Sequence, residues 1–179
     1  IAVALASVAG MTAFTPFPLV LVAQQAFVAL DKFPLAAVPF FILAGNLMGA
    51  GGISTRLVDF AKAVVGGVQG GLACTCILTC MIFAAVSGSS VATTFAIGAI
   101  LIPSMVRHGY PVSFAAALQA TSAELGVVIP PSIPMILFGV AAEVSIGELF
   151  IAGVVPGIFI GATLMLFVHV YCRIKGWGL

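Results

Sequence analysis

The sequence predicts an all-α membrane protein that crosses the bilayer several times. Hydrophobic residues make up 63% of the chain and charged residues only 6%, and the mean hydropathy is +1.33. A soluble domain normally carries about a quarter charged residues, so water is not the main solvent of this chain. The frequent Gly and Ala residues favour helices that pack closely in lipid, and the sequence lacks the period-two alternation of a membrane β-barrel.

Long uncharged runs locate the expected membrane segments. They extend over residues 1–30, 33–55, 63–106, 125–142 and 149–172. Several exceed the roughly 20 residues that a helix needs to cross a bilayer. Because the first run begins at Ile1 with no charged segment before it, we expect the chain to be a fragment of a longer protein.

The scarce polar residues exclude other classes of protein. The six basic residues are scattered singly between apolar runs, so no nucleic-acid partner is expected. Cys74, Cys76 and Cys80 lie in an apolar segment with no His or carboxylate nearby in sequence. We interpret them as small packing residues, not as metal ligands or parts of a disulfide framework.

Residues 1–71 are expected to form scaffold-type helices and an amphipathic connection. Residues 1–15 are expected to be the last part of a membrane-spanning helix. The proline-containing segment 15–18 is expected to end this helix. Residues 19–30 can then lie along the membrane surface. Two prolines lie in the first turns of the next helix, at 34–48, where proline is tolerated best.

A short amphipathic helix is expected after the glycines at 49–52. Ser54 is placed to cap this helix, which carries Arg56, Asp59 and Lys62. Four further glycines between residues 66 and 71 close the segment.

The uncharged stretch 72–105 is expected to form a re-entrant helical hairpin. As one straight helix it would measure about 50 Å, whereas the hydrocarbon core is about 30 Å thick. Its polar cluster, Ser87-Gly88-Ser89-Ser90, lies at the middle, and each arm of about 22 Å is too short to span. We therefore expect the tip near mid-membrane, where non-helical backbone must be buried in protein or face a wet cavity.

The segment 112–142 is expected to be a helix that is broken near its middle. Pro130, Pro131 and Pro134 lack N–H donors and interrupt the hydrogen-bond ladder. A last helix is expected to begin at Leu149. The chain then divides into scaffold-type helices and connection at 1–71, a transport core at 72–148, and a closing transmembrane helix at 149–179.

The charges indicate how the chain is oriented in the membrane. A hairpin that returns to its own side places five of the six basic residues together: Arg56, Lys62, Arg107, Arg173 and Lys175. Lys32, Glu143 and Glu148 then lie on the opposite side. The positive-inside rule makes the basic side cytoplasmic, so the hairpin is expected to enter from the cytoplasm.

A serine-rich hairpin tip beside a broken helix is suited to binding an ion within lipid. Half-helix C-termini offer carbonyl groups to a cation, and half-helix N-termini offer N–H groups to an anion. Neutral hydroxyl oxygens are added by Ser87, Ser89, Ser90, Thr93 and Thr94. A set without carboxylate favours Na⁺ over H⁺ as the coupling ion, although Glu124 lies near the break. Alternatively, the small residues only allow close packing and the prolines only kink the helix.

The same residues resemble a known family. The motifs are Phe40-Phe41-Ile42-Leu43-Ala44-Gly45, Gly52-Ile53-Ser54, Ser87-Gly88-Ser89-Ser90-Val91-Ala92, Ile102-Pro103, Gly109-Tyr110, Gly126 with Ile129-Pro130-Pro131-Ser132-Ile133, Leu149-Phe150, Ala152-Gly153 and Pro156-Gly157. In this order, and over nearly the whole chain, they resemble the large membrane subunit of tripartite ATP-independent periplasmic (TRAP) transporters, the DctM-like family. Such subunits have two inverted repeats, and this chain resembles the N-terminal one.

The resemblance implies a Na⁺-driven, elevator-type importer of organic acids, C4-dicarboxylates or other carboxylates, in the bacterial cytoplasmic membrane. Its implied partners are a small DctQ-like membrane subunit and a DctP-like periplasmic binding protein, with Na⁺ as coupling ion and no cofactor. By matching positions, the tip and the unwound helix at 126–132 together hold one Na⁺. The candidate residues of this ion site are Ser87, Gly88, Ser89, Ser90, Thr93, Gly126, Val128, Pro130 and Ser132.

Candidates for the substrate cavity are Asn46, Ser90, Glu124, Pro131 and Ser132. Glu124 lies about 18 Å along its helix, where a carboxylate is costly enough to suggest a function. Alternatively, Ser122, Gln119 or backbone donors satisfy it, or it lies in a water-filled cleft. Asn46 faces the same cavity or makes a hydrogen bond between helices.

Two other classes of function make different demands on the sequence. An intramembrane serine hydrolase needs a serine, a base and an oxyanion hole within reach of one another. The tip lacks the Gly-x-Ser-x-Gly spacing, and both histidines, His108 and His169, lie near predicted membrane edges, so no enzymatic activity is expected. A channel or a purely structural membrane subunit stays open as the alternative to a transporter.

Overall fold

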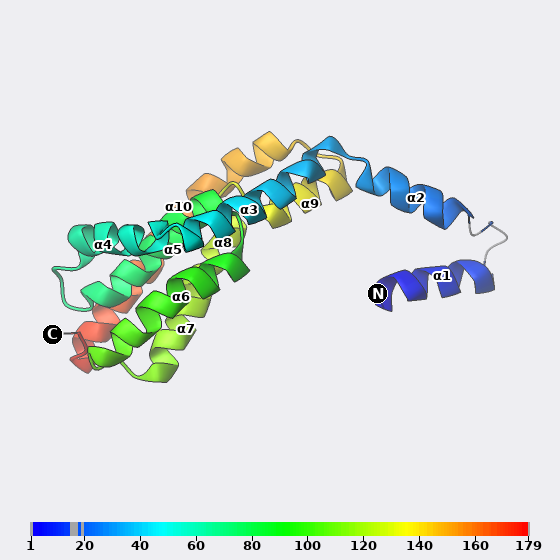
Figure 1. Ribbon diagram of the computed structural model, residues 1–179. Helices are drawn as coiled ribbons and strands as arrows, with labels where there is room; N and C mark the ends of the chain where they lie inside the picture. The colour runs from blue at the N-terminus through cyan, green and yellow to red at the C-terminus, as the bar shows by residue number, and fades with distance from the viewer. Residues whose placement is uncertain (1, 15–17, 19, 179) are drawn as a thin grey trace. The chain divides into compact units, whose positions relative to one another are not determined.

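The computed structural model describes residues 2–14, 18 and 20–178, and these form helices joined by short turns, with no β-strand among them (Figure 1). The helices are α1 (Ala2–Phe14), α2 (Val20–Leu30), the 3₁₀ helix η1 (Phe33–Ala36), α3 (Ala37–Ala50), α4 (Ile53–Val65), α5 (Gly71–Ser87), α6 (Ser90–Arg107), α7 (Val112–Ala123), α8 (Leu125–Val128), α9 (Ile133–Ala142) and α10 (Ile146–Lys175). The predicted all-α fold is confirmed. The chain divides into two compact units, Ile1–Ala36 and Ala37–Leu179.

The first unit contains α1, α2 and η1. Two helices were expected here, and both are present. The segment predicted to close the first one, 15–18, lies outside the described residues apart from Pro18. The second helix ends where the N–H of Asp31 donates to the carbonyl of Phe27 across 2.9 Å. Its predicted position along the membrane surface stays a prediction.

Among the described residues, three helical stretches are long and apolar enough to cross a membrane, as expected of a multi-pass protein: Phe33–Ala50, Ser90–Arg107 and Ile146–Lys175. A fourth span results if the bent pair Val112–Val128 and Ile133–Ala142 counts as one. The arms of the hairpin are longer than predicted, with 17 residues in α5 and 18 in α6, because α6 continues through Pro103 to Arg107. At about 1.5 Å per residue α6 is about 27 Å long, so the re-entrant geometry stays a prediction.

Two helix starts differ from the sequence prediction. Ser54 was expected to cap the amphipathic helix, but α4 begins at Ile53 after Gly52, whose φ of 73° lets the chain turn directly into the helix. Ser54 is therefore inside the first turn and buried. The last helix begins at Ile146 rather than at Leu149, because the Ser145 hydroxyl accepts the N–H of Glu148 and caps it earlier.

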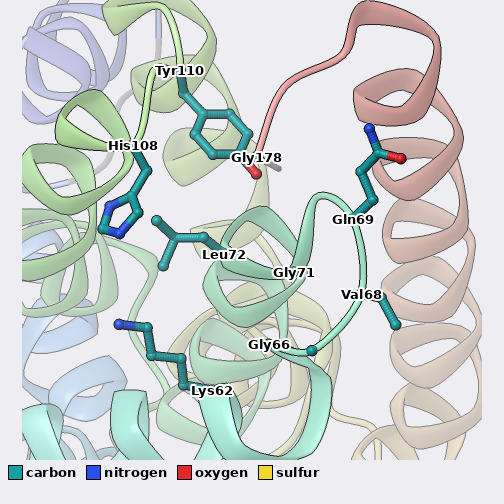
Figure 2. Close-up of a pocket in the computed structure, with 10 residues that line it drawn as sticks. Lys62, Gly66, Val68, Gln69, Gly71, Leu72, His108, Tyr110 and Gly178 are labelled. Atoms are coloured by element: carbon teal, nitrogen blue, oxygen red, sulfur yellow. The ribbon is translucent and has the colours of Figure 1, made fainter.

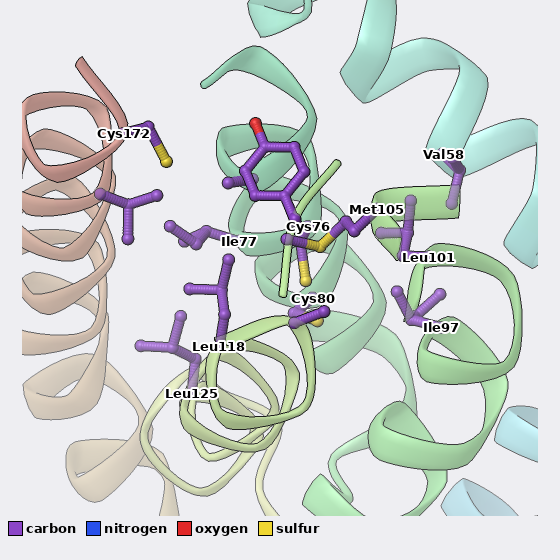
Figure 3. Packing of buried hydrophobic residues seen from close by; sticks show 14 of the residues in the cluster. Val58, Cys76, Ile77, Cys80, Ile97, Leu101, Met105, Leu118, Leu125 and Cys172 are labelled. Atoms are coloured by element: carbon purple, nitrogen blue, oxygen red, sulfur yellow. The ribbon is translucent and has the colours of Figure 1, made fainter. Parts of the chain in front are cut away.

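Helix α5 is the central element of the second unit and packs against α4, α6, α7, α8 and α10. Its side chains Ile77, Cys80 and Phe83 are fully buried, and Leu101 of α6 and Leu118 of α7 pack in the same cluster (Figure 3). All four cysteines are buried and free. An apolar hairpin thus has its first arm enclosed by protein, which positions its polar turn against the helices that follow.

Candidate functional site

The hairpin turn consists of two residues whose local chemistry ends one helix and begins the next. Gly88 adopts φ 62° and ends α5, with its N–H donating to the carbonyl of Ala84 across 2.9 Å. Ser89 is extended and caps α6, its hydroxyl accepting the N–H of Ala92 across 3.2 Å. The polar cluster therefore forms the turn that the sequence predicts.

The turn lies directly against the break in the α7–α9 helix. The N–H of Ile133 donates to the carbonyl of Gly88 across 3.1 Å, and a Cβ on Gly88 would lie 2.7 Å from the carbonyl oxygen of Pro131. On the other side, a Cβ on Gly126 would lie 3.2 Å from the backbone nitrogen of Ser90. Two glycines allow this close approach of backbones, and the structure brings the predicted tip and the predicted break together.

Three oxygens at the turn form a small buried group, which we call the tip oxygen cluster: the hydroxyls of Ser87 and Thr93 and the carbonyl of Ser89. The two hydroxyl oxygens are 3.4 Å apart, and the Thr93 hydroxyl donates to the Ser89 carbonyl across 2.8 Å. Both Ser87 and Thr93 are fully buried. Ser90 is only half-buried, and its carbonyl accepts the hydroxyl of Thr94 across 2.8 Å.

The break is shaped by Ser132 and the residues before it. The helix bends by 41° between α8 and α9. The fully buried Ser132 caps α9, because its hydroxyl accepts the N–H of Met135 and donates to the carbonyl of Val127 across 2.7 Å. Pro130 and Pro131 are half-buried between α8 and this cap.

Val128, an ion-site candidate, directs its carbonyl oxygen toward α10. That oxygen lies 2.6 Å from where a Cβ on Gly153 would be. Ile129 likewise packs on α10, against Gly157. The helix before the break is therefore fitted to a glycine-lined face of α10, and the Val128 carbonyl is not grouped with the tip oxygen cluster.

Sequence reasoning missed the role of Gln119 in holding the hairpin. Its side chain is 1% exposed, and its Nε2 donates to the carbonyl of Thr93 across 3.3 Å. Its Oε1 accepts the thiol of Cys76 at 3.1 Å, and a Cβ on Gly98 would lie 3.2 Å from its Cγ. One amide of α7 thus joins both arms of the hairpin. The available signal was a lone Gln within an apolar helix.

A cleft of about 710 Å³ opens beside the turn, between α3, the start of α4 and one face of α6. Asn46, Ser54, Thr55 and Ser89 supply its polar walls. Ser54 is 3% exposed, and its hydroxyl has no hydrogen-bond partner among the described residues. The cleft joins the predicted substrate-cavity residue Asn46 to the hairpin turn.

The other substrate-cavity candidates lie elsewhere. Ser90, Pro131 and Ser132 are at the contact between turn and break, outside this cleft. Glu124 lies at the junction of α7 and α8 with an exposed side chain. The sequence left open that Gln119 bonds the Glu124 carboxylate. In the structure the Gln119 amide bonds the Thr93 carbonyl of the hairpin instead.

The comparisons with known proteins agree with this architecture. The family model described as the tripartite ATP-independent periplasmic transporter, DctM component, matches residues 1–179. This chain belongs to the DctM family. It is 48% identical to the isethionate TRAP transporter permease protein DctMQ of Oleidesulfovibrio alaskensis, over 99% of this chain and 28% of that protein.

Further DctM relatives carry other substrate names. The chain is 47% identical to the C4-dicarboxylate TRAP transporter large permease protein DctM of Pseudomonas aeruginosa, over 90% of this chain and 38% of that protein. It is 48% identical to the 2,3-diketo-L-gulonate TRAP transporter large permease protein YiaN of Escherichia coli, over 84% of this chain and 35% of that protein. The chain thus spans about a third of the length of these relatives. All are named transporter permeases, which agrees with the prediction that the chain has no enzymatic activity.

Proposed function

We propose that this chain forms one repeat of the membrane permease of a Na⁺-coupled TRAP transporter that imports organic acids. The single observation that carries the proposal is the contact between the hairpin turn and the broken helix, where two interrupted helices meet at the bond from Ile133 to Gly88. Such interruptions are tolerated in a membrane where they line a binding site. If the hairpin served only for packing, neither it nor the α7–α9 helix would need an interrupted backbone at their contact.

The tip oxygen cluster is suited to a dehydrated monovalent cation. It supplies neutral oxygens from Ser87, Thr93 and Ser89, without a carboxylate that would hold a divalent ion. Na⁺ is close in radius to Ca²⁺, whose oxygen ligands lie at about 2.3–2.6 Å. Two oxygens at about 2.4 Å from one ion, at a right angle, are about 3.4 Å apart, which is the separation of the Ser87 and Thr93 hydroxyls.

The cleft beside the turn supports an anionic substrate. Asn46 contributes amide N–H groups to the wall of this cleft. The relatives' names include a sulfonate and several carboxylates, which share a compact anionic group. A cleft with neutral donors on this repeat can bind one part of such a substrate, and the second repeat would supply the rest.

The proposed partners and location follow from the family. A DctQ-like small membrane subunit and a DctP-like periplasmic binding protein would deliver the organic acid, in a bacterial inner membrane. Arg56, Lys62, Arg107, Arg173 and Lys175 would face the cytoplasm. The alternative, a channel or a purely structural subunit, requires no coupling ion and no accumulation against a gradient.

Uptake against Na⁺ concentration tests the proposal in proteoliposomes that contain the complete permease and its partners. Ser87→Ala, Ser89→Ala and Ser90→Ala should each raise the Na⁺ concentration for half-maximal uptake. For Ser87 the loss of a ligand to a charged group corresponds to about ten- to hundredfold. Ser89→Ala and Ser90→Ala should have smaller effects than Ser87→Ala, because the hydroxyl of neither Ser89 nor Ser90 is in the tip oxygen cluster.

Thr163→Ala is the matched control, because Thr163 lies exposed on α10 and its hydroxyl donates to the carbonyl of Phe159 within the same helix. It should leave the Na⁺ dependence unchanged. Uptake that continues at the same rate without Na⁺, or that never exceeds the outside concentration, would contradict ion coupling and favour a channel. Thermal stability of each variant without Na⁺ separates a lost ion site from a lost fold.

A further inference from the structure

The polar side chains that lie away from the turn and the break differ in their surroundings. Lys62 and His108 line a cavity of about 410 Å³ near the C-terminal end of the chain, and both side chains are exposed (Figure 2). Gln119 is different, because it lies within α7 and is only 1% exposed. A buried amide costs free energy unless it is bonded, and an apolar side chain would fill the same space without that cost. The partners of Gln119 therefore indicate what the amide does.

We propose that Gln119 is a positioning residue for the Na⁺ site, and that it sets both the affinity for Na⁺ and the preference for Na⁺ over a smaller cation. This inference rests on the proposed function, because it requires the tip oxygen cluster to bind an ion. The hydrogen bonds of Gln119 go to atoms other than the three oxygens of the cluster. Gln119 therefore acts on the ion through the residues that it holds.

The amide of Gln119 is bonded at both of its ends. Its Nε2 donates to the Thr93 carbonyl across 3.3 Å and to the Cys80 sulfur across 3.5 Å. Its Oε1 accepts the Cys76 thiol across 3.1 Å. Cys76 and Cys80 belong to α5, whereas Thr93 belongs to α6. One side chain of α7 thus ties the two arms of the hairpin to each other.

The placement of the two arms decides the geometry of the tip oxygen cluster. The Ser87 hydroxyl lies at the end of α5 and the Thr93 hydroxyl in the first turn of α6, and the two oxygens are 3.4 Å apart. Thr93 is held from two sides, because its hydroxyl donates to the Ser89 carbonyl and its own carbonyl accepts the Gln119 amide. Without the amide, α6 can shift against α5. The ion would then have to draw the oxygens into place, and a site that is not preorganised binds more weakly.

Gly98 shows how closely the Gln119 side chain fits against α6. A Cβ on Gly98 would lie 3.2 Å from Cγ of Gln119 and 3.6 Å from its Cδ. Gly98 lies inside α6, where glycine is less favourable than alanine. The missing side chain gives the amide the room to reach the Thr93 carbonyl. A methyl group at Gly98 would therefore displace the amide without removing it.

The test measures the melting temperature of the purified complete permease in detergent while NaCl or LiCl replaces choline chloride at constant ionic strength. An ion that binds only the folded protein raises this temperature, and the dependence on concentration gives the dissociation constant. Gln119→Met keeps an unbranched side chain and removes the amide. It should raise the Na⁺ dissociation constant about threefold, the effect of one average interhelical hydrogen bond. It should also reduce the preference for Na⁺ over Li⁺, because selectivity depends on the size and rigidity of the site.

Two further variants separate positioning from general loosening. Gly98→Ala should raise the Na⁺ dissociation constant less than Gln119→Met, while the melting temperature without ions stays equal or rises, because alanine favours a helix. Ser122→Ala is the matched control on α7. Ser122 is fully buried, and its hydroxyl has no hydrogen-bond partner of good geometry among the described residues, although the Cys76 thiol is near. This control should change neither the dissociation constant nor the preference for Na⁺.

Each outcome supports or overturns the proposal. Weaker Na⁺ binding and a smaller preference over Li⁺ in Gln119→Met and Gly98→Ala, but not in Ser122→Ala, support it. Unchanged values in Gln119→Met, together with weaker binding in Ser87→Ala, overturn it and leave the proposed ion site intact. An equal loss in Ser122→Ala overturns it as well. If Gln119→Met does not fold, unchanged Na⁺ binding in Gly98→Ala overturns it. If Ser87→Ala binds Na⁺ normally, the proposed ion site itself is wrong, and the role of Gln119 is wrong with it.

Discussion

The backbone N–H of Ile133 donates to the carbonyl of Gly88 across 3.1 Å, so the hairpin turn is bonded to the first residue of α9. Both groups lie at helix ends and lack partners within their own helices. In a bilayer an unpaired backbone group costs several kcal/mol because no water replaces the missing bond. The turn and the break therefore stabilise each other, and separation of the two would expose both groups at once.

Gly88→Ala should destabilise the permease more than Gly109→Ala. Both glycines have positive φ, so each substitution carries the cost of a left-handed conformation, about 1–2 kcal/mol. At Gly88 the new methyl group also approaches the Pro131 carbonyl, whereas at Gly109 no described residue beyond its chain neighbours lies within 4 Å. Thermal unfolding of both variants in detergent measures the difference. Equal melting temperatures would mean that the turn and the break are not in contact.

The turn and the break were predictable from the sequence because both arise from local chemistry. A Gly-Ser step ends one helix and begins the next, and consecutive prolines interrupt a helix whatever its tertiary contacts are. The start of α4 was misplaced because Gly52 and Ser54 are both acceptable at a helix start, and burial of Ser54 decided between them. Tertiary contacts could not be predicted, since nothing near Gln119 in sequence indicates that Thr93 is its hydrogen-bond partner.

Gln119→Leu should cost about 1 kcal/mol of stability, and Gln119→Ala about 2 kcal/mol or more. Interhelical hydrogen bonds in membranes average about 0.6 kcal/mol, and Leu removes the bonds to Thr93 and Cys76 while keeping the volume. Ala also leaves a cavity beside Gly98. Unfolding in increasing denaturing detergent measures both variants. If Gln119→Leu proves more stable than the natural protein, the amide is retained for a reason other than stability.

Gly153→Ala should destabilise the packing of α10 on the broken helix, whereas Gly147→Ala should be neutral or stabilising. A Cβ at Gly153 would lie 2.6 Å from both the Val128 carbonyl and the Met135 methyl group. At Gly147 the nearest atom is the Ser145 hydroxyl at 3.8 Å, so Ala gains about 0.5–1 kcal/mol of helix preference. Comparison of the two melting temperatures checks this pair. A tolerated Gly153→Ala would show that α10 packs more loosely than described.

The last prediction concerns orientation. Helix α10 has 30 residues and is about 45 Å long, so Glu148 near its start and Lys175 at its end lie beyond opposite sides of a hydrocarbon core of about 30 Å. The Lys175 end meets the α4–α5 turn, where the Gly70 N–H donates to the Gly178 carbonyl across 3.4 Å, and this groups Lys62 with the basic C-terminal residues. The positive-inside rule then predicts that this end faces the cytoplasm. In a permease whose native cysteines are replaced, Glu148→Cys should react with an impermeant thiol reagent added outside intact cells, and Lys175→Cys should react only after the membrane is opened. The reverse pattern would invert the orientation and place Lys62, Arg173 and Lys175 on the periplasmic side.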